Sequence, residues 1–269
     1  RLIAMKPSEI KTLQENILTR YYEYKRPLPR RETQDPYAIH ISEVMAQQTQ
    51  VDRVIPYRKK RMHEIPNYQA LAKLPKIELL TYRSWLWFNS RALRLQECAN
   101  VVIEQYGWQL PYDKNQLLAL PWIWPYTASA ISAFAWNLPE PVIDTNIRRV
   151  LIFLLKLPED ISYNELEHIA QQLIPEWKSR DRHNALMDYW ATQLTAKKTK
   201  IKSLWKQSKF EGSDREVRGR IVKTLTSKKQ ALEIEQIKEE FPHKDIEKIL
   251  NGMIAEKIIQ KNWTKIEIG

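Results

Sequence analysis

Apolar residues recur at helical spacing along most of the chain. One stripe comprises Leu95, Cys98, Ala99, Val102 and Tyr106, which follow the helical spacing i, i+3, i+4, i+7 and i+11 and so share one face of a helix. Prolines break the first two thirds of the chain into segments of ordinary helix length joined by short loops. These breaks are expected at Pro56, Pro66, Pro75, Pro111, Pro121, Pro125, Pro139 and Pro158. The pattern predicts a mainly α-helical protein.

Polar residues mark the starts of several helices. Asp35, directly ahead of a proline, has the pattern of an N-cap followed by a first helical residue. Ser162 with Glu165, and Ser213 with Glu216, have the spacing of a capping box, in which each side chain bonds the other residue's backbone N–H. We therefore expect helices to begin directly after positions 35, 162 and 213.

The last 60 or so residues have a different pattern. Three short apolar sets at helical spacing are followed by two alternating stretches, "KIIQK" and "TKIEI", which suit a small hairpin. Three helices and a hairpin predict a winged-helix-like domain over residues 210–269. Its third helix carries Asp245, Glu247 and Glu256 among lysines, which argues against direct base reading and favours docking or phosphate positioning. The three sets are Val217, Ile221 and Leu225; Leu232, Ile234, Ile237 and Phe241; and Ile246, Ile249, Leu250, Met253 and Ile254.

A lysine-rich segment precedes that domain. Residues 196–209 contain six lysines and no acidic residue. Such a run cannot pack on itself, so it is either a solvated connector or a connector lying on phosphates. We place a domain boundary near residue 210, which leaves residues 1–209, with this connector, as the first domain.

The net charge points to a polyanionic partner. Lysine and arginine total 43 against 32 acidic residues, a formal charge of +11. Nucleic acid is the leading candidate because phosphates bind cations with release of counterions. A protein that is merely basic is the alternative on charge alone.

The single cysteine and the absence of long apolar runs limit the compartment and the cofactors. Cys98 cannot form an internal disulfide or a site with several thiolates, and its place on an apolar stripe predicts a buried packing residue. No apolar run approaches the roughly 18 residues of a membrane span, and no signal peptide opens the sequence. We expect an intracellular protein of the cytoplasm or nucleoid, with no metal and no membrane partner.

Three stretches contain most of the candidate catalytic and DNA-binding residues. They are "DPYAIHISEVMAQQTQVDRVIPY" (35–57), "LPWIWPYTASAISAFA" (120–135) and "PVIDTNIRRVL" (141–151). They resemble, in the same order, the opening helices, the hairpin with its following helix, and the catalytic aspartate loop of MutY-type adenine DNA glycosylases. These enzymes belong to the helix-hairpin-helix superfamily that includes endonuclease III, and the similarity runs from about Leu28 to about Leu194. The resemblance implies an endonuclease III-like helical domain.

The resemblance also implies roles for two carboxylates. Hydrolysis of an N-glycosidic bond in duplex DNA needs the base swung out, the leaving base protonated and an oxocarbenium-like sugar stabilised. Glu43 would be the acid, with a pKa raised by a partly apolar pocket, and Asp144 would stay ionised and face the developing positive charge. Without the motif, Glu43 would be a surface residue of an amphipathic helix and Asp144 an N-cap.

Other matched positions refine the expected activity. Tyr126 stands where lyase-active relatives carry a Schiff-base lysine, so a monofunctional hydrolase that leaves an abasic site is expected. Tyr126 is then a catalytic-site residue beside the two carboxylates, with a packing role as the alternative. Gln47 and Gln48 match the region that enters the gap left by the flipped base, and Asn146 matches an active-site amide. Arg91, Arg148 and Arg149 are candidate phosphate contacts, with a solvated face as the alternative for each.

The chain departs from the family pattern in several places. Many members bind an iron–sulfur cluster through four cysteines, but Leu194 stands where the first would fall, so no cluster is expected. The tail is too short for the usual domain that recognises 8-oxoguanine, and Arg30 replaces the tryptophan of the family's "LPWR".

Tryptophans occupy positions where the family has glycine. Trp122 and Trp124 stand at the two hairpin glycines, and Trp85 and Trp87 stand where Gly-Leu-Gly is expected. The family's hairpin uses glycine because the turn needs positive φ and because backbone N–H groups must approach a phosphate closely. Only five of the 269 residues are glycine, which is under 2%, whereas a glycine content of about 7% is typical. Trp108, Trp136 and Trp190 also stand where related sequences commonly have glycine.

Three explanations compete for these tryptophans. They form a natural aromatic platform for splayed bases, or the sequence has been altered by engineering or in its record, or they fill a core and the hairpin is lost. We favour the second, because the replacements are of one kind at unrelated sites. If Trp122 and Trp124 are present, we expect a distorted turn and weakened binding of phosphate.

The resulting hypothesis is a monomeric base-excision-repair glycosylase. It would act on double-stranded DNA and release adenine mispaired with 8-oxoguanine or guanine, without a cofactor. One alternative is a thymine or uracil glycosylase acting opposite guanine, against which "QQTQ" argues mildly. The other is a DNA-binding protein of the same fold without catalytic activity.

Overall fold

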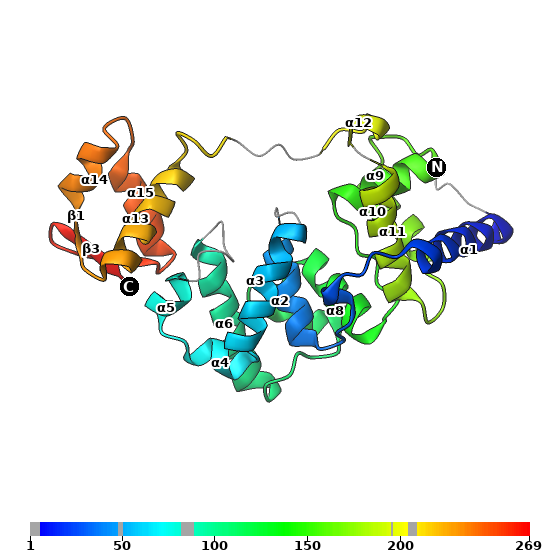
Figure 1. Ribbon diagram of the computed structural model, residues 1–269, viewed down its shortest axis with the longest axis horizontal. Coiled ribbons are helices and arrows are strands. Elements are labelled where there is room, and N and C mark those ends of the chain that lie inside the picture. Colours follow the sequence, from blue (N-terminus) through cyan, green and yellow to red (C-terminus); the bar gives the residue numbers. More distant parts are fainter. Residues whose placement is uncertain (1–5, 48–50, 82–88, 195, 204–208) are drawn as a thin grey trace. The chain divides into compact units, whose positions relative to one another are not determined.

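The computed structural model describes residues 6–47, 51–81, 89–194, 196–203 and 209–269. Helices dominate these residues, which confirms the mainly α-helical prediction (Figure 1). The helices are α1 (Pro7–Tyr24), the short 3-10 helix η1 (Pro29–Arg31), α2 (Pro36–Ala46), α3 (Val51–Glu64), α4 (Tyr68–Lys73), α5 (Lys76–Thr81), α6 (Asn89–Tyr106), α7 (Lys114–Ala119), α8 (Pro125–Trp136), α9 (Thr145–Leu155), α10 (Tyr163–Gln172), α11 (Ser179–Gln193), α12 (Ala196–Thr199), α13 (Asp214–Lys228), α14 (Ile234–Glu240) and α15 (Ile246–Ala255). The strands are β1 (Leu232–Glu233), β2 (Ile259–Asn262) and β3 (Lys265–Ile268).

Two of the three predicted helix starts are capped as expected. The Asp35 carboxylate accepts the backbone N–H of Tyr37 at 3.1 Å, so α2 begins directly after it. Ser162 and Glu165 form the predicted capping box at the start of α10. These local hydrogen bonds satisfy N–H groups that have no partner inside the helix.

Two local predictions were wrong. Ser213 precedes α13, but its hydroxyl donates to the Phe210 carbonyl and Glu216 accepts the Gly212 N–H, so no capping box forms. Pro56 does not end a helix but lies inside α3. Proline removes only one ladder hydrogen bond, and a helix can continue through that loss.

Residues 1–43, 110–119 and 123–206 form one compact unit. α1 packs along α11, and α8 contacts both α7 and α11 (Figure 1). One apolar cluster joins α9, α10 and α11 through Ile147, Leu151, Leu166 and Leu186. α8 is buried on every side from Thr127 to Ala135, so it has no solvent face over that stretch.

Residues 44–109, 120–122 and 207–269 form the second compact unit. α4 packs on α6, and α5 packs on α13. Leu80 of α5 therefore shares one apolar cluster with Val217, Leu250 and Ile266 of the C-terminal region. The predicted boundary near residue 210 stays a prediction, because the second compact unit contains residues from both sides of that position.

The C-terminal region has the predicted order of elements. Three helices, α13, α14 and α15, are followed by the hairpin of β2 and β3. A short strand, β1, adds to the hairpin, so that the sheet order is β1-β3-β2 with antiparallel pairs. Alternation along "TKIEI" places Ile266 in the core, fully buried.

The cysteine prediction is confirmed. Cys98 lies in α6 and is 1% exposed, beside the equally buried Ala99 and Val102. Burial, with a smaller contribution from Glu97, raises the pKa of the Cys98 thiol to about 12. The thiol is therefore a packing group and not a nucleophile at neutral pH. None of the described helices combines the length and apolar character that crossing a membrane requires.

A buried histidine makes the stability depend on pH. Burial lowers the pKa of His40 in α2 to about 4, whereas an unfolded histidine titrates near 6.5. As the pH falls, the unfolded chain binds the proton first, so the stabilisation is complete above about pH 6.5 and is lost towards about pH 4. We expect this residue to lower the free energy of unfolding by about 3 kcal/mol across that window, measured by urea denaturation.

Two variants test this assignment. His40→Gln should reduce the pH dependence by about this amount, and His168→Gln, at an exposed position, should not reduce it in this way. Equal slopes in all three chains would contradict the prediction.

Candidate active site

Glu43 is a buried carboxylate on α2. The cap at Asp35 and the apolar sequence around it produce a helix in which the Glu43 residue is only 4% exposed. The Tyr126 hydroxyl, from the first turn of α8, donates to a Glu43 carboxylate oxygen at 3.0 Å. A carboxylate taken out of water needs such a partner. The structure thus joins two predicted catalytic residues that are 83 positions apart.

Asp144 lies at the N-terminus of α9. One of its carboxylate oxygens accepts the backbone N–H groups of Asn146 at 2.9 Å and Ile147 at 2.7 Å. These two donors and the positive end of the helix dipole favour a negative charge on Asp144. The N-cap role and the expected role beside a developing cation are therefore compatible, because both need the ionised form.

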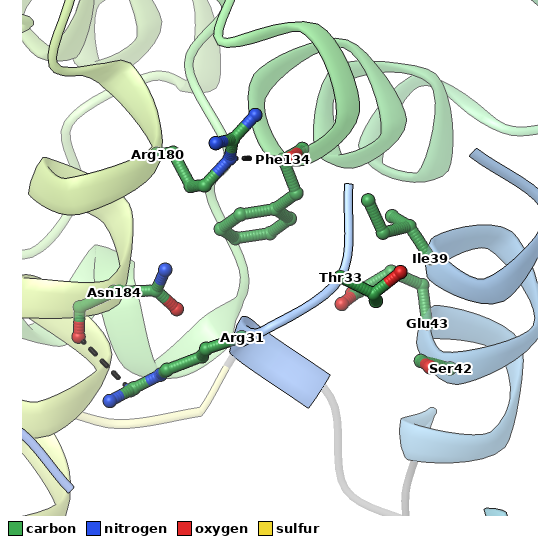
Figure 2. Close-up of a pocket in the computed structure, with 8 residues that line it drawn as sticks. All are labelled: Arg31, Thr33, Ile39, Ser42, Glu43, Phe134, Arg180 and Asn184. Carbon is green, nitrogen blue, oxygen red and sulfur yellow. Dashed lines mark hydrogen bonds between the residues drawn. The ribbon is translucent and has the colours of Figure 1, made fainter. Parts of the chain in front are cut away.

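A pocket adjoins Glu43. Figure 2 shows Glu43 and Ile39 of α2 across from Asn184 of α11, with the ring of Phe134 between them. Arg180 closes one end, where its guanidinium donates to the Phe134 carbonyl at 2.6 Å. The complete lining is Arg31, Thr33, Ile39, Ser42, Glu43, Phe134, Arg180 and Asn184. An aromatic ring beside a few converging polar groups is typical of a small-molecule or base site.

An ionic cluster lies beside the pocket. Arg31 binds both carboxylate oxygens of Asp188, at 2.7 and 2.8 Å, and Arg26 binds the same carboxylate at 2.5 Å. Burial alone raises the pKa of Asp188, but the hydrogen bonds from Arg31 and Arg26 outweigh it and hold that pKa below its usual value. The Arg31 Nε atom is buried and has no hydrogen-bond partner among the described residues.

Sequence reasoning missed this cluster. Arg31 and Asp188 are 157 positions apart, and neither lies in the three motif stretches. Arg31 lies in "PRR" and Asp188 in "MDY". Neither stretch has a charge pattern that predicts an ion pair between the two residues. One signal was available at Arg31, which stands at the arginine of the family's "LPWR".

Removing Asp188 is expected to destabilise the fold strongly. The Asp188 and Arg31 side chains are 8% and 9% exposed, so Asp188→Ala leaves a buried guanidinium without its counter-charge. We expect the free energy of unfolding to fall by about 3 kcal/mol. Asp214→Ala, which breaks an exposed ion pair with Lys244, should change it by less than about 1 kcal/mol. Urea denaturation of both variants measures this, and equal losses would argue against it.

A buried histidine holds the chain ahead of Asp144. The Val142 N–H donates to His183 Nε2 at 3.0 Å, and His183 Nδ1 lies 2.6 Å from the Ser179 carbonyl. Burial and the neighbouring Arg182 guanidinium keep the pKa of His183 well below its usual value. The neutral ring can therefore accept at Nε2 and donate at Nδ1, which ties the aspartate loop to α11.

The predicted DNA-contact residues have varied surroundings. Arg91 donates to the Gln47 carbonyl at 2.9 Å, at the end of α2. Arg148 is buried and donates to the carbonyls of Glu159 and Lys202, and Arg149 donates to the Ile201 carbonyl at 3.1 Å. The three arginines thus hold backbone carbonyls, and phosphate contact by any of them stays a prediction. Gln47 and Asn146 are half-buried, and Gln48 lies outside the described residues.

The predicted hairpin keeps a glycine-like turn. Trp122 has φ 65°, in the left-handed region that favours glycine, and the expected distortion of this turn stays a prediction. Trp124 has φ −85° and ψ 164°, an extended backbone that needs no glycine. Trp122 is 41% and Trp124 61% exposed, which rules out the interpretation that they fill a core. Trp85 and Trp87 lie outside the described residues.

A four-cysteine iron–sulfur cluster, which many related sequences carry, does not fit this chain. Cys98 is its only cysteine and is buried in α6. Leu194, at the position of the first ligand, packs instead into the apolar cluster of α9 and α10.

Comparison with known proteins identifies the family. The model of the HhH-GPD superfamily of base excision DNA repair proteins matches residues 41–176. An adenine DNA glycosylase of Mycolicibacterium smegmatis is 33% identical, over 78% of this chain and 78% of that protein. An adenine DNA glycosylase of Mus musculus is 34% identical over 70% of this chain, which spans only 39% of that longer protein.

A solved DNA glycosylase structure is also similar to this chain. The structure of a thermostable thymine-DNA glycosylase superposes with a TM-score of 0.65 and 31% identity, over 69% of this chain and 87% of that one. The matched residues 41–176 contain Glu43, Tyr126 and Asp144. The chain belongs to the HhH-GPD superfamily of base excision DNA repair proteins.

Proposed function

We propose that this protein is a monofunctional DNA glycosylase that releases adenine mispaired with 8-oxoguanine or guanine and leaves an abasic site. The observation that carries the proposal is the buried Glu43 carboxylate, bound by Tyr126 and open to a pocket. The names of the relatives in Mycolicibacterium smegmatis and Mus musculus support adenine as the base.

The chemistry follows from the two carboxylates. Glu43, protonated in the reacting complex, gives its proton to the leaving base as the C1′–N bond breaks and its electrons pass to the base. Asp144, held ionised by two N–H groups, stabilises the positive charge that develops on the sugar. Water then adds to C1′ and loses a proton to Glu43, which restores the acid. Tyr126 replaces the Schiff-base lysine of lyase-active relatives, so the sugar–phosphate backbone stays intact.

The pocket supplies a place for the flipped base. Phe134 offers an apolar face, and the polar side chains of Thr33, Glu43 and Asn184 in the same lining offer hydrogen-bonding groups to the base. The enzyme would bind duplex DNA as a monomer in the cytoplasm or nucleoid, without an iron–sulfur cluster, and its C-terminal winged-helix-like region would position phosphate.

Thymine or uracil opposite guanine is the second candidate base. The thymine-DNA glycosylase structure, at 31% identity over 69% of this chain, supports this second candidate. Both candidates use the same carboxylates and differ only in the contacts that the pocket makes with the base.

Base release in single turnovers decides between them. Duplexes carrying A:8-oxoguanine, A:G, T:G and U:G are incubated with excess protein, and Asp144→Asn serves as the control. Release of adenine alone, lost in the control, supports the proposal; release of thymine or uracil assigns the second candidate. If no duplex reacts but all are bound, the protein is a DNA-binding member without catalytic activity.

A further inference from the structure

Four tryptophans adopt a backbone conformation that favours glycine. Their φ angles are 77° at Trp108, 65° at Trp122, 61° at Trp177 and 57° at Trp263. Seven tryptophans lie in the described ranges, so more than half of them are left-handed. Only a few per cent of non-glycine residues have positive φ, and a bulky side chain there is an outlier.

Two of the four occupy the third position of a turn. Trp177 lies in the turn closed by the Lys178 N–H on the Pro175 carbonyl at 3.2 Å. Trp122 follows Pro121 in the turn between α7 and α8. Positive φ at the third residue is the mark of a type II turn, which takes glycine there and often proline just before it.

The other two occupy equally specific positions. Asn262 pairs with Lys265, so the hairpin of β2 and β3 closes through a two-residue loop of which Trp263 is the first. Positive φ at the first loop residue alone is the pattern of a type II′ turn, which has glycine at that place. Trp108 directly follows Gly107, whose φ is 58°, in a pair of left-handed residues after α6.

Burial of the indole rings does not offset the strain. Trp108 is 59% exposed, Trp177 82% and Trp263 96%. Trp122 is 41% exposed; its Nε1 donates to Glu97 at 2.6 Å. Surface contacts of this kind contribute little, whereas the Cβ clash is present in every left-handed residue except glycine.

We infer that the working protein carries glycine at positions 108, 122, 177 and 263, because one codon of its gene is decoded as glycine. UGA differs by a single base from the tryptophan codon UGG and by a single base from the glycine codon GGA. Reading UGA as tryptophan gives the residue written at these positions, whereas reading it as glycine gives the working protein. The two residues are then exchanged at sites that share only that codon. This exchange also accounts for a chain with ten tryptophans and only five glycines.

The inference goes beyond the proposed function and is independent of which base is released. In the working form, the hairpin between α7 and α8 and the tip of the β2–β3 hairpin carry no side chain at their left-handed positions. Backbone N–H groups there can approach a phosphate or another surface closely.

Gene sequence and peptide mass test the inference directly. We expect UGA at all four codons and, in protein purified from its own cells, four tryptic peptides whose masses correspond to glycine. UGG codons at these positions, or peptides that contain tryptophan, would overturn it.

Variants of the full chain test its structural basis. Replacement of all four residues by glycine should raise the melting temperature by roughly 5–10 °C, since the strain of each is relieved. Replacement of the same four by alanine is the matched control, because alanine removes the indole but keeps the Cβ atom. A rise with glycine and not with alanine supports the inference. Equal melting temperatures of the glycine and alanine variants would contradict it.

Discussion

Glu43→Gln is expected to slow base release in single turnovers by roughly 10³-fold or more, with little change in affinity for the duplex. The substitution keeps the size of the side chain and an oxygen that can accept from Tyr126, but removes the proton that the leaving base needs. Rapid quenching of a reaction with excess enzyme measures the chemical step, and fluorescence anisotropy measures binding.

A neighbouring residue provides the control for Glu43. Ser42 lines the same pocket, but its hydroxyl donates to the Ala38 carbonyl of its own helix at 2.5 Å. Ser42→Ala should therefore change the rate by less than about tenfold. A Glu43→Gln enzyme that releases base as fast as the Ser42→Ala enzyme would remove Glu43 from the mechanism.

Trp122→Gly is expected to tighten binding to duplex DNA by roughly tenfold or more. Glycine at this left-handed position leaves room for backbone N–H groups to bond a phosphate oxygen, and each bond to a charged group contributes about 1.5–3 kcal/mol. The salt dependence of binding should become steeper, because an additional phosphate contact releases more counterions. Titration of one duplex at several salt concentrations measures both effects.

Trp122→Ala separates the effect of the backbone from that of the indole. It removes the ring and its bond to Glu97 but keeps a Cβ atom at φ 65°. We expect it to recover only a small part of the affinity. Tighter binding by the alanine variant than by the glycine variant would mean that the indole, and not the turn, limits binding. That result would leave the proposed base specificity untouched, because specificity is measured on the released base.

The candidate active site combines a helix with an ionic cluster formed by residues far apart in the sequence. α2 places Glu43 in the interior, and α8 supplies Tyr126 from a helix with no exposed face beyond its first turn. Arg31, which lines the pocket, is held in place by its two hydrogen bonds to Asp188. Groups held in this way need little rearrangement when charge develops during the reaction, which is how enzymes lower the barrier of such steps.

Local signals were sufficient to predict most helices and to select the candidate catalytic carboxylates. Asp35 and Ser162 cap helices because their partners lie within three residues, so the bonds depend on sequence order alone. Glu43, Tyr126 and Asp144 were recognisable because they lie inside motif stretches. Alternation of "TKIEI" likewise placed Ile266 in a core without any knowledge of its neighbours.

Only the tertiary structure decided which distant groups meet. Leu80 packs with the C-terminal helices, Arg31 finds Asp188, and Arg148 turns inward to backbone carbonyls instead of outward to solvent. A charged or apolar side chain in the sequence has many equally suitable partners, and its choice depends on how the whole chain is packed.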